Sequence, residues 1–179
     1  MLITIIYIGS SNNLFQDVVR DYEKRIKNLG RSIGLKEIIY KEIKNSNKKN
    51  ATEKKDEETK KLIGQKEKEA VNILLDIEGS KLNSVEFSEC ILDQADINQN
   101  INFFIGGSEG IDRKYFGDFD KIISFGDLTW PHKMFKMMLL EQIYRSITII
   151  NKHPYHCLLY TSDAADEGLG VDLGGRRII

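Results

Sequence analysis

The sequence predicts an α/β domain whose mainly parallel sheet is covered by helices on both faces. Two observations support this fold class. Short apolar runs alternate with segments of helical periodicity about five times along the chain, which is the pattern of parallel strands joined by crossover helices. The runs are almost wholly apolar, as in Leu2–Ile8, and do not alternate with polar residues. Strands buried on both faces of a parallel sheet have this composition.

The composition is that of one soluble, globular domain. The 179 residues are 41% hydrophobic and 30% charged, with a formal net charge of −1. No apolar run approaches the roughly 18 residues of a membrane span, and the apolar start lacks the basic flank of a signal peptide. We therefore expect a cytoplasmic protein with no membrane partner. Cys90 and Cys157 are too few and too far apart to indicate a disulfide framework or a metal site.

The elements follow from local periodicity. Strands are expected at 2–8, 35–43, 71–77, 101–105 and 121–125. Helices are expected at 15–29 and 57–70, after a cap at Ser84, briefly from Asp112, and from 130–132 onward. Residues 44–58 are rich in Lys, Asn and Glu and lack large apolar side chains, so we interpret them as a mobile loop or the frayed start of a helix.

The final helix is apolar nearly all round between residues 134 and 150. Such a helix is buried on more than one side. One face can pack on the sheet, and the rest needs another cover, most simply a second subunit. Glu141 and Arg145 are polar exceptions spaced i,i+4, which fits either an internal ion pair or a polar patch required by a site.

Three strand exits carry the residues of a candidate ligand site. They are 76–79, 105–110 and 126–131. In open α/β sheets, ligands bind at the carboxyl ends of the strands, and glycine lets the backbone approach a ligand closely. On glycine content alone, a tight turn is the favoured explanation of 105–110. Neither the phosphate-binding nor the dinucleotide-binding spacing is present. The backbone N–H and C=O groups of three such loops could hold a flat heterocycle.

Histidine and tyrosine side chains suggest a second functional group. His132 follows Pro131 and is either a residue of the helix start or a base. His153, Tyr155 and His156 form a cluster that could stack on a nucleobase or move a proton. The histidines have no accompanying Cys or carboxylate motif, so we predict no metal site.

The composition changes after His156. Residues 158–179 contain no Lys or Asn, whereas the preceding chain is rich in both. Residues 157–167 can be encoded by the transposase-end adapter used in sequencing libraries. We therefore expect one domain at 1–156 and a disordered, non-native tail at 157–179 that is excluded from fold reasoning.

Four ordered motifs resemble the RlmH family of SPOUT methyltransferases. They are FIGGSEG at 104–110, LTWPH at 128–132, LEQIYR at 140–145 and NKHPYH at 151–156. The resemblance covers essentially residues 1–156. It implies methyl transfer from S-adenosylmethionine to N3 of a pseudouridine in 23S ribosomal RNA, on the assembled ribosome and without a metal. It also implies a homodimer and a C-terminal trefoil knot, an exception to the rule of un-knotted chains.

Two other interpretations remain open from the sequence. One is a non-catalytic ribosome-binding or RNA-binding protein that retains the fold. It is motivated by Cys157, which stands where the family commonly has a basic residue before its end. The other is a flavodoxin-like nucleotide-binding module, which requires only the α/β pattern.

The resemblance also implies site residues. The implied cofactor contacts are Leu75, Gly107, Gly126, Asp127, Leu128, Thr129, Trp130 and Pro131. The implied substrate and catalytic residues are His132, Glu141, Arg145, Tyr155 and His156. The imide N3 must lose its proton before it attacks the methyl group, and Arg145 suits stabilisation of the resulting anion because it stays charged. The general base could be His132, Glu141 or His156.

Overall fold

The sheet has five strands, all parallel, in the order β2-β1-β4-β3-β5. The computed structural model describes residues 1–9 and 15–156, apart from the side chains of residues 132 and 133. The strands are β1 Leu2–Ile8, β2 Glu37–Ile43, β3 Ala70–Lys81, β4 Asn100–Ile105 and β5 Lys121–Ser124. The α/β architecture with a parallel sheet is therefore confirmed. The predicted tail at 157–179 lies outside the described residues.

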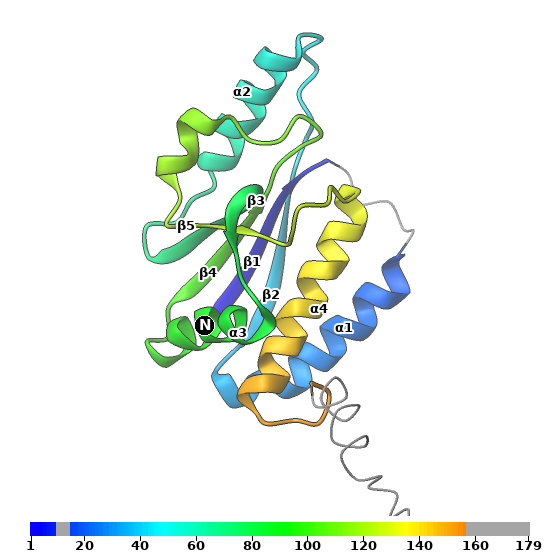
Figure 1. The fold of residues 1–179 in the computed structure, drawn as a ribbon, viewed down its shortest axis with the longest axis vertical. Helices are drawn as coiled ribbons and strands as arrows, with labels where there is room; N and C mark the ends of the chain where they lie inside the picture. Colours follow the sequence, from blue (N-terminus) through cyan, green and yellow to red (C-terminus); the bar gives the residue numbers. More distant parts are fainter. Residues whose placement is uncertain (10–14, 157–179) are drawn as a thin grey trace, which may run out of the picture.

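Helices cover both faces of the sheet (Figure 1). They are α1 Gln16–Leu29, the 3-10 helix η2 Gly30–Ile33, α2 Ala51–Ile63, α3 Ser84–Asp96, the 3-10 helix η3 Arg113–Asp118 and α4 His132–Ile150. α1, α3 and α4 share one core with the sheet, and α2 and η3 share a second core on the other face. Among the described residues, no helix is long and apolar enough to cross a bilayer.

The central strands supply side chains to both cores, which explains their unbroken apolar sequence. Phe103 and Phe104 are neighbours in β4 and point to opposite faces, as successive strand residues must. Each is fully buried, and such burial contributes about 1.5–3 kcal/mol per side chain. Ile5 and Ile6 divide in the same way in β1. These residues place the carboxyl ends of β1 and β4 side by side at the centre of the sheet.

α4 lies between α1 and α3, on top of the sheet (Figure 1). No residue from 134 to 150 is exposed, which confirms that this helix is buried on more than one side. Much of the cover that we assigned to a second subunit comes from α1 and α3 of the same chain. Met137 and Met138 remain half-buried on the outer side of α4.

The prediction for the segment before β3 was wrong, because α2 begins at Ala51 and ends at Ile63 instead of spanning 57–70. The Asn50 side chain accepts hydrogen bonds from the backbone N–H groups of Thr52 and Glu53, which satisfies donors that a helix start leaves unpaired. The polar residues that suggested fraying therefore include a helix cap.

The exit from β3 also differs from the prediction. β3 continues to Lys81, with its pairing to β5 interrupted between Leu75 and Ser80. The intervening residues leave the ladder while the strand resumes beyond them, which is a bulge of the kind often found beside functional sites. α3 is capped by Asn83 instead of Ser84, in a capping box with Glu86.

Candidate functional site

A hollow of about 360 Å³ lies at the carboxyl edge of the sheet, where three chain segments meet. Its walls come from the β3 bulge, the loop after β4 and the segment after β5. The lining residues are Leu75, Asp76, Ile77, Ile105, Gly106, Gly107, Ser108, Glu109, Gly110, Ser124, Phe125, Gly126, Leu128, Thr129, Trp130 and Phe135. We call it the cofactor pocket. The predicted convergence of the three strand exits is therefore found in the structure.

The loop after β4 forms a tight turn that also lines the pocket, so the two interpretations of its glycines are compatible. Gly107 and Gly110 pair in an antiparallel bridge, and Gly110 N–H donates to Gly107 O over 2.9 Å. Gly110 has a φ of +71°, a conformation that side chains rarely adopt. A Cβ on Gly107 would overlap the Glu58 carboxylate. Glycine is therefore required both for the turn and for close packing behind it.

Glu58 is a functional candidate that the sequence analysis missed. It belongs to α2 and is 0% exposed. Its Oε1 accepts a hydrogen bond from Ser46 N–H over 2.9 Å, whereas its Oε2 faces Gly107 and has no hydrogen-bond partner among the described residues. A buried carboxylate oxygen without a donor is costly. Its position behind the pocket follows from a contact between α2 and the glycine loop, and helical periodicity alone gives no signal for it.

The segment after β5 forms the outer rim of the pocket. Gly126 has a φ of +110°, and the Ser124 hydroxyl bonds to both the N–H and the carbonyl of Gly126. This turn carries Leu128 and Trp130 to the rim, where they are 69% and 37% exposed. Large apolar side chains held open around a concave site are suited to cover an apolar ligand surface.

Two of the predicted cofactor residues do not line this pocket. Asp127 points to the surface and pairs with Lys81 over 2.7 Å, and Pro131 is the residue that precedes α4. The other six do line it, as described above. The structure thus brings Leu75, Gly107 and most of 126–131 together, and it gives Asp127 and Pro131 supporting places in the rim.

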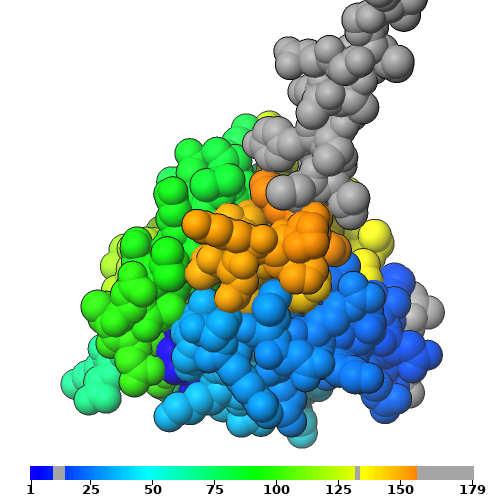
Figure 2. Space-filling view, turned by 90° about the horizontal axis from the view of Figure 1, so that it is seen from below, coloured from blue at the N-terminus to red at the C-terminus, as the bar shows by residue number. Residues whose placement is uncertain are grey.

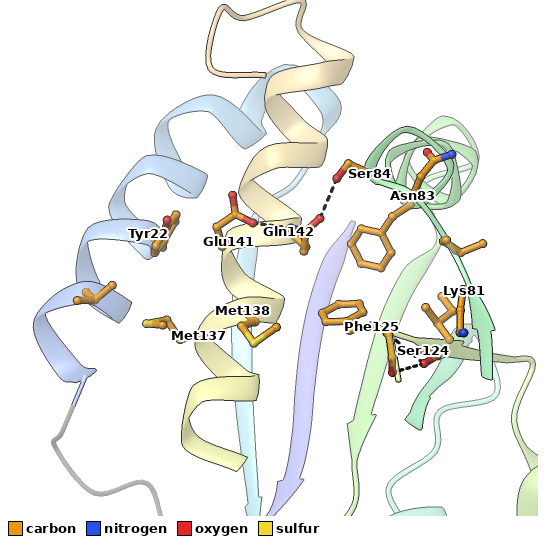
Figure 3. Close-up of a pocket in the computed structure, with 15 residues that line it drawn as sticks. Tyr22, Lys81, Asn83, Ser84, Ser124, Phe125, Met137, Met138, Glu141 and Gln142 are labelled. Carbon is orange, nitrogen blue, oxygen red and sulfur yellow. Dashed lines mark hydrogen bonds between the residues drawn. The ribbon is translucent and has the colours of Figure 1, made fainter. Parts of the chain in front are cut away.

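A second hollow has a volume of about 720 Å³, and Figure 3 shows the residues that line it. We call it the α4 groove. Its lining residues are Val18, Tyr22, Lys81, Leu82, Asn83, Ser84, Phe87, Ile123, Ser124, Phe125, Gly126, Met137, Met138, Glu141 and Gln142. Ser124, Phe125 and Gly126 line both hollows, so the start of the β5 exit is their common wall. A ligand in the groove would therefore lie next to a ligand in the cofactor pocket.

Glu141 is the centre of a polar cluster on the groove side of α4 (Figure 3). Its Oε1 accepts hydrogen bonds from Arg145 Nε over 2.9 Å and from the Tyr155 hydroxyl over 3.1 Å. Its Oε2 accepts a bond from Gln142 Nε2 over 2.6 Å. The internal ion pair that the i,i+4 spacing suggested is therefore present, and Gln142 and Tyr155 bond to it as well. That a site requires this polar patch stays a prediction.

The surroundings shift the pKa values of two members of the cluster, Arg145 and Tyr155. Partial burial alone would lower the pKa of Arg145, but the hydrogen bonds and negative charge of Glu141 outweigh it and raise that pKa. Partial burial raises the pKa of the Tyr155 phenol, and Tyr22 and Glu141 raise it further. Arg145 is therefore a permanent cation and Tyr155 a permanent hydrogen-bond donor. The Tyr155 ring packs on Tyr144, with ring centroids 4.9 Å apart.

The C-terminal motif does not reach the cofactor pocket of its own chain. Figure 2 shows residues near 151–156 in orange, between the α1 and η2 region in blue and the α3 region in green. This is the end of the molecule where β1 starts (Figure 1), opposite the strand exits. α4 separates the two ends by about 28 Å, at 1.5 Å per residue. Tyr155 and His156 are half-buried there, and the side chain of His132 lies outside the described residues.

Comparison with known proteins agrees with this geometry. A family model described as "Predicted SPOUT methyltransferase" matches residues 1–156. The chain belongs to the SPOUT methyltransferase family. The match covers the pocket, the groove and the Glu141 cluster. The trefoil knot implied by the resemblance remains a prediction.

Relatives with the same name support the narrower resemblance to the RlmH family. The chain is 38% identical over 156 residues to a ribosomal RNA large subunit methyltransferase H of Mycoplasmopsis synoviae, covering 87% of this chain and 99% of the relative. It is 36% identical over 154 residues to the protein of that name from Mycoplasmopsis agalactiae, covering 86% and 97%. It is 32% identical over 142 residues to that of Rhizobium etli, covering 79% and 89%.

The residues present fit the methyl donor of this family, S-adenosylmethionine. The donor has a flat adenine, an edge of hydrogen-bonding atoms and a cationic sulfonium centre. The pocket supplies apolar walls from Leu75 and Trp130, backbone groups from the glycine loop, and carboxylates at Asp76 and Glu109. A volume of about 360 Å³ lies within the range of small-molecule sites. The expectation that no metal takes part remains a prediction.

Proposed function

We propose that this protein transfers the methyl group of S-adenosylmethionine to N3 of a pseudouridine in large-subunit ribosomal RNA, on the assembled ribosome. The observation that supports this most strongly is the meeting of three strand exits around one pocket. The names of the relatives favour this proposal over a non-catalytic RNA-binding protein. Ribosomal RNA as substrate implies that the protein works in the cytoplasm.

The bound cofactor would supply an electrophilic methyl group on sulfur. The residues of this chain would hold that group at the wall shared by the pocket and the groove. Leu75 and Trp130 would cover the apolar part of the cofactor, and the glycine loop would bond to its polar edge. The gain from this arrangement is proximity, since a fixed in-line approach can supply about 7–11 kcal/mol of a bimolecular barrier.

In a homodimer, the Glu141 cluster of one protomer would act on the nucleobase held at the pocket of the other. N3 of a pseudouridine is flanked by two carbonyl groups, so its anion carries charge on their oxygens. Arg145, held charged and oriented by Glu141, is suited to stabilise that anion. Tyr155 donates its one hydroxyl proton to Glu141 and so helps to hold the cluster in place. Glu141 already accepts four hydrogen bonds, from Gln142, Arg145 and Tyr155, so we assign it to positioning. His132 and His156 remain the candidates for the base.

A homodimer would explain why the C-terminal motif lies far from its own pocket. The α4 groove is rich in apolar and methionine side chains, and Val18 on its edge is 42% exposed. A two-fold axis across α4 would set the helices antiparallel. The carboxyl end of α4, with Tyr155 and His156, would then lie beside the strand exits of the other copy. Each site would combine the pocket of one protomer with the Glu141 cluster and the C-terminal motif of its partner, which Tyr155 joins by its bond to Glu141.

The catalytic proposal is tested with ribosomes from a strain that lacks the modification. The chain of residues 1–156 is incubated with tritiated S-adenosylmethionine and these ribosomes, and cofactor affinity is measured separately by calorimetry. We expect cofactor binding and incorporation of label into large-subunit RNA. Binding without incorporation would favour the non-catalytic alternative. No cofactor binding would contradict the assignment of the pocket.

The shared site is tested by mixing two inactive variants. Gly126→Val disrupts the pocket, because valine does not tolerate a φ of +110°. Arg145→Ala removes the cation of the cluster. If each site uses both protomers, mixed dimers contain one intact site, and a random mixture regains about a quarter of wild-type activity. No recovery on mixing, with dimers formed, would place every catalytic residue on one chain.

A further inference from the structure

The segment between β2 and the second turn of α2 has a charge pattern that the proposed chemistry does not use. Residues 44–55 contain five lysines and one acidic residue, Glu53. They also contain three asparagines, whose amides can bond to phosphates and base edges. We call residues 44–55 the basic segment. A charged run is usually a solvated face, so its position and pairing decide whether it has a further role.

Most of this positive charge has no internal partner. Lys44, Lys48 and Lys49 are exposed, and only Lys48 forms an ion pair within the described part of the chain. That pair, with Glu53, spans 3.4 Å between side chains that are 55% and 61% exposed. Exposed pairs of this kind contribute little to stability. The lysines are therefore available for an anionic partner.

The basic segment nevertheless has a fixed position. Ser46 is buried; its N–H donates to Glu58 and its hydroxyl donates to Glu57 over 2.6 Å. Asn50 caps α2. The side chains of this segment are thus presented from an anchored backbone, which lowers the entropy cost of binding a partner.

Its position is beside the cofactor pocket. The Lys54 ammonium group donates to the Ser108 hydroxyl over 3.1 Å, and Ser108 lines the pocket. At the other end, Gly9 N–H donates to Ile43 O over 2.9 Å, which places the start of the segment at the carboxyl end of β1. Figure 1 shows that α2 begins beyond the carboxyl ends of the strands and runs back along the sheet.

The opposite wall of the pocket has the reverse charge. Asp76 lines it at the β3 bulge, and Glu78 lies two residues further on, bonded to Arg113. Asp127 lies on the same side and is paired with Lys81. Because Arg113 and Lys81 neutralise Glu78 and Asp127, this side carries only the charge of Asp76 in excess. A polyanion that approaches the pocket is therefore attracted from the side of the basic segment and only weakly repelled from the side of the bulge.

We propose that the basic segment, residues 44–55, is the surface over which the ribosomal RNA flanking the target nucleotide is held. This inference rests on the proposed function and adds the RNA-contacting surface to it. RNA backbone carries a dense negative charge, and lysines on an anchored, exposed segment match it without any requirement for base sequence. The asparagines can add contacts to phosphates or base edges. The segment would act on substrate binding and leave cofactor binding unchanged.

The test is a triple variant, Lys44→Gln, Lys48→Gln and Lys49→Gln, with a control that carries the same change in charge. The control replaces three exposed lysines at the amino end of the sheet, Lys27, Lys36 and Lys68, by glutamine. Affinity for ribosomes that lack the modification is measured at several salt concentrations for both variants and for the wild type. Cofactor affinity is measured by calorimetry and the free energy of unfolding by urea titration.

We expect the triple variant to bind ribosomes roughly tenfold or more weakly near physiological salt. Its plot of log affinity against log salt should be shallower by about 2, from three contacts at about 0.7 each. The control should resemble the wild type, and all three proteins should bind the cofactor equally. If both triple variants lose the same affinity for ribosomes, the loss is explained by net charge alone, and the proposal is overturned. Lost affinity with an unchanged salt slope would indicate a ribosomal protein as the partner and would also overturn it.

These results are separable from the proposed function. If the wild type does not methylate ribosomes, the catalytic proposal fails whatever the variants do. If the wild type methylates them and the first triple variant does so with the same KM, only the assignment of the basic segment fails.

Discussion

Gly107→Ala is the sharpest probe of how α2 supports the cofactor pocket. Gly107 is buried, and a Cβ there would overlap Glu58 Oε2 and lie 3.3 Å from both Glu58 Cδ and Ile8 Cγ2. The Glu58 side chain cannot move into solvent, because it is 0% exposed and is held by Ser46 N–H. Overpacking of this kind costs about 1–3 kcal/mol. If the loop moves instead, the same free energy is lost from cofactor binding, which is about fivefold to a hundredfold in Kd.

A second substitution at Glu58 tests the cause. Glu58→Ala removes the overlapping carboxylate and leaves only the 3.3 Å contact with Ile8 Cγ2, so Gly107→Ala should cost much less in that background. Glu58→Gln keeps the same volume and should leave the cost in place. For each variant, urea unfolding measures the free energy of unfolding, and calorimetric titration with S-adenosylmethionine measures the affinity for the cofactor. Because the residues are in contact, we expect an interaction energy of about 1 kcal/mol or more for the alanine pair.

Gly117→Ala is the matched control, since a Cβ on Gly117 meets nothing within 4 Å. It should change neither stability nor cofactor affinity by more than about 0.5 kcal/mol. If Gly107→Ala behaves like this control, the carboxylate of Glu58 does not pack behind the glycine loop. The same reasoning would be refuted if Gly107→Ala lowered the free energy of unfolding equally in the wild-type and Glu58→Ala backgrounds.

Three further predictions concern the sheet edge, the cluster and acid stability. Gly79→Ala places a Cβ 2.6 Å from backbone atoms of Ile123 in β5, so it should lower the free energy of unfolding by at least about 2 kcal/mol. Urea titration measures this change. An unchanged free energy of unfolding would contradict the close approach of β3 to β5. Arg145→Lys keeps the positive charge but loses the two-pronged contact of the guanidinium with Glu141. Steady-state kinetics should show kcat reduced about tenfold with cofactor affinity unchanged. An unchanged kcat would mean that Arg145 has no part in catalysis. Hydrogen bonds from Lys114 lower the pKa of Asp112 in the folded state, so its stabilising effect is present above the unfolded value of about 3.9 and is lost as pH falls through the folded value. Asp112→Asn should therefore flatten the acid limb of unfolding free energy against pH, and an unaltered limb would count against this contact.

The strands and most helices could be predicted because their patterns are local. The run in β1 is apolar because both of its faces are covered, and the periodicity of α1 reflects one buried face. The cofactor loops could be predicted because glycines at several strand exits must share one edge of a parallel sheet. The α2 start was missed although Asn50 followed by Glu53 is a cap signal. The Asn83 capping box was missed in the same way.

Other features depend on contacts that no local pattern contains. Glu58 lies in an ordinary charged helix sequence, and its burial results from the approach of the glycine loop to α2. The bulge in β3 depends on how β5 pairs on both sides of it. The sequence indicated that Tyr155 and the strand exits both belong to a site, but only the direction of α4 shows that they lie at opposite ends of one chain.

Nucleoside analysis of the methylated ribosome tests the central claim most directly. Large-subunit RNA from ribosomes treated with the protein and S-adenosylmethionine is digested to nucleosides and examined by mass spectrometry. We predict a new methylated pseudouridine with the methyl group on N3, present with the wild type and strongly reduced with Arg145→Ala. Methylation at another atom, methylation of another nucleoside, or no methylated product from a protein that binds the cofactor would contradict the account.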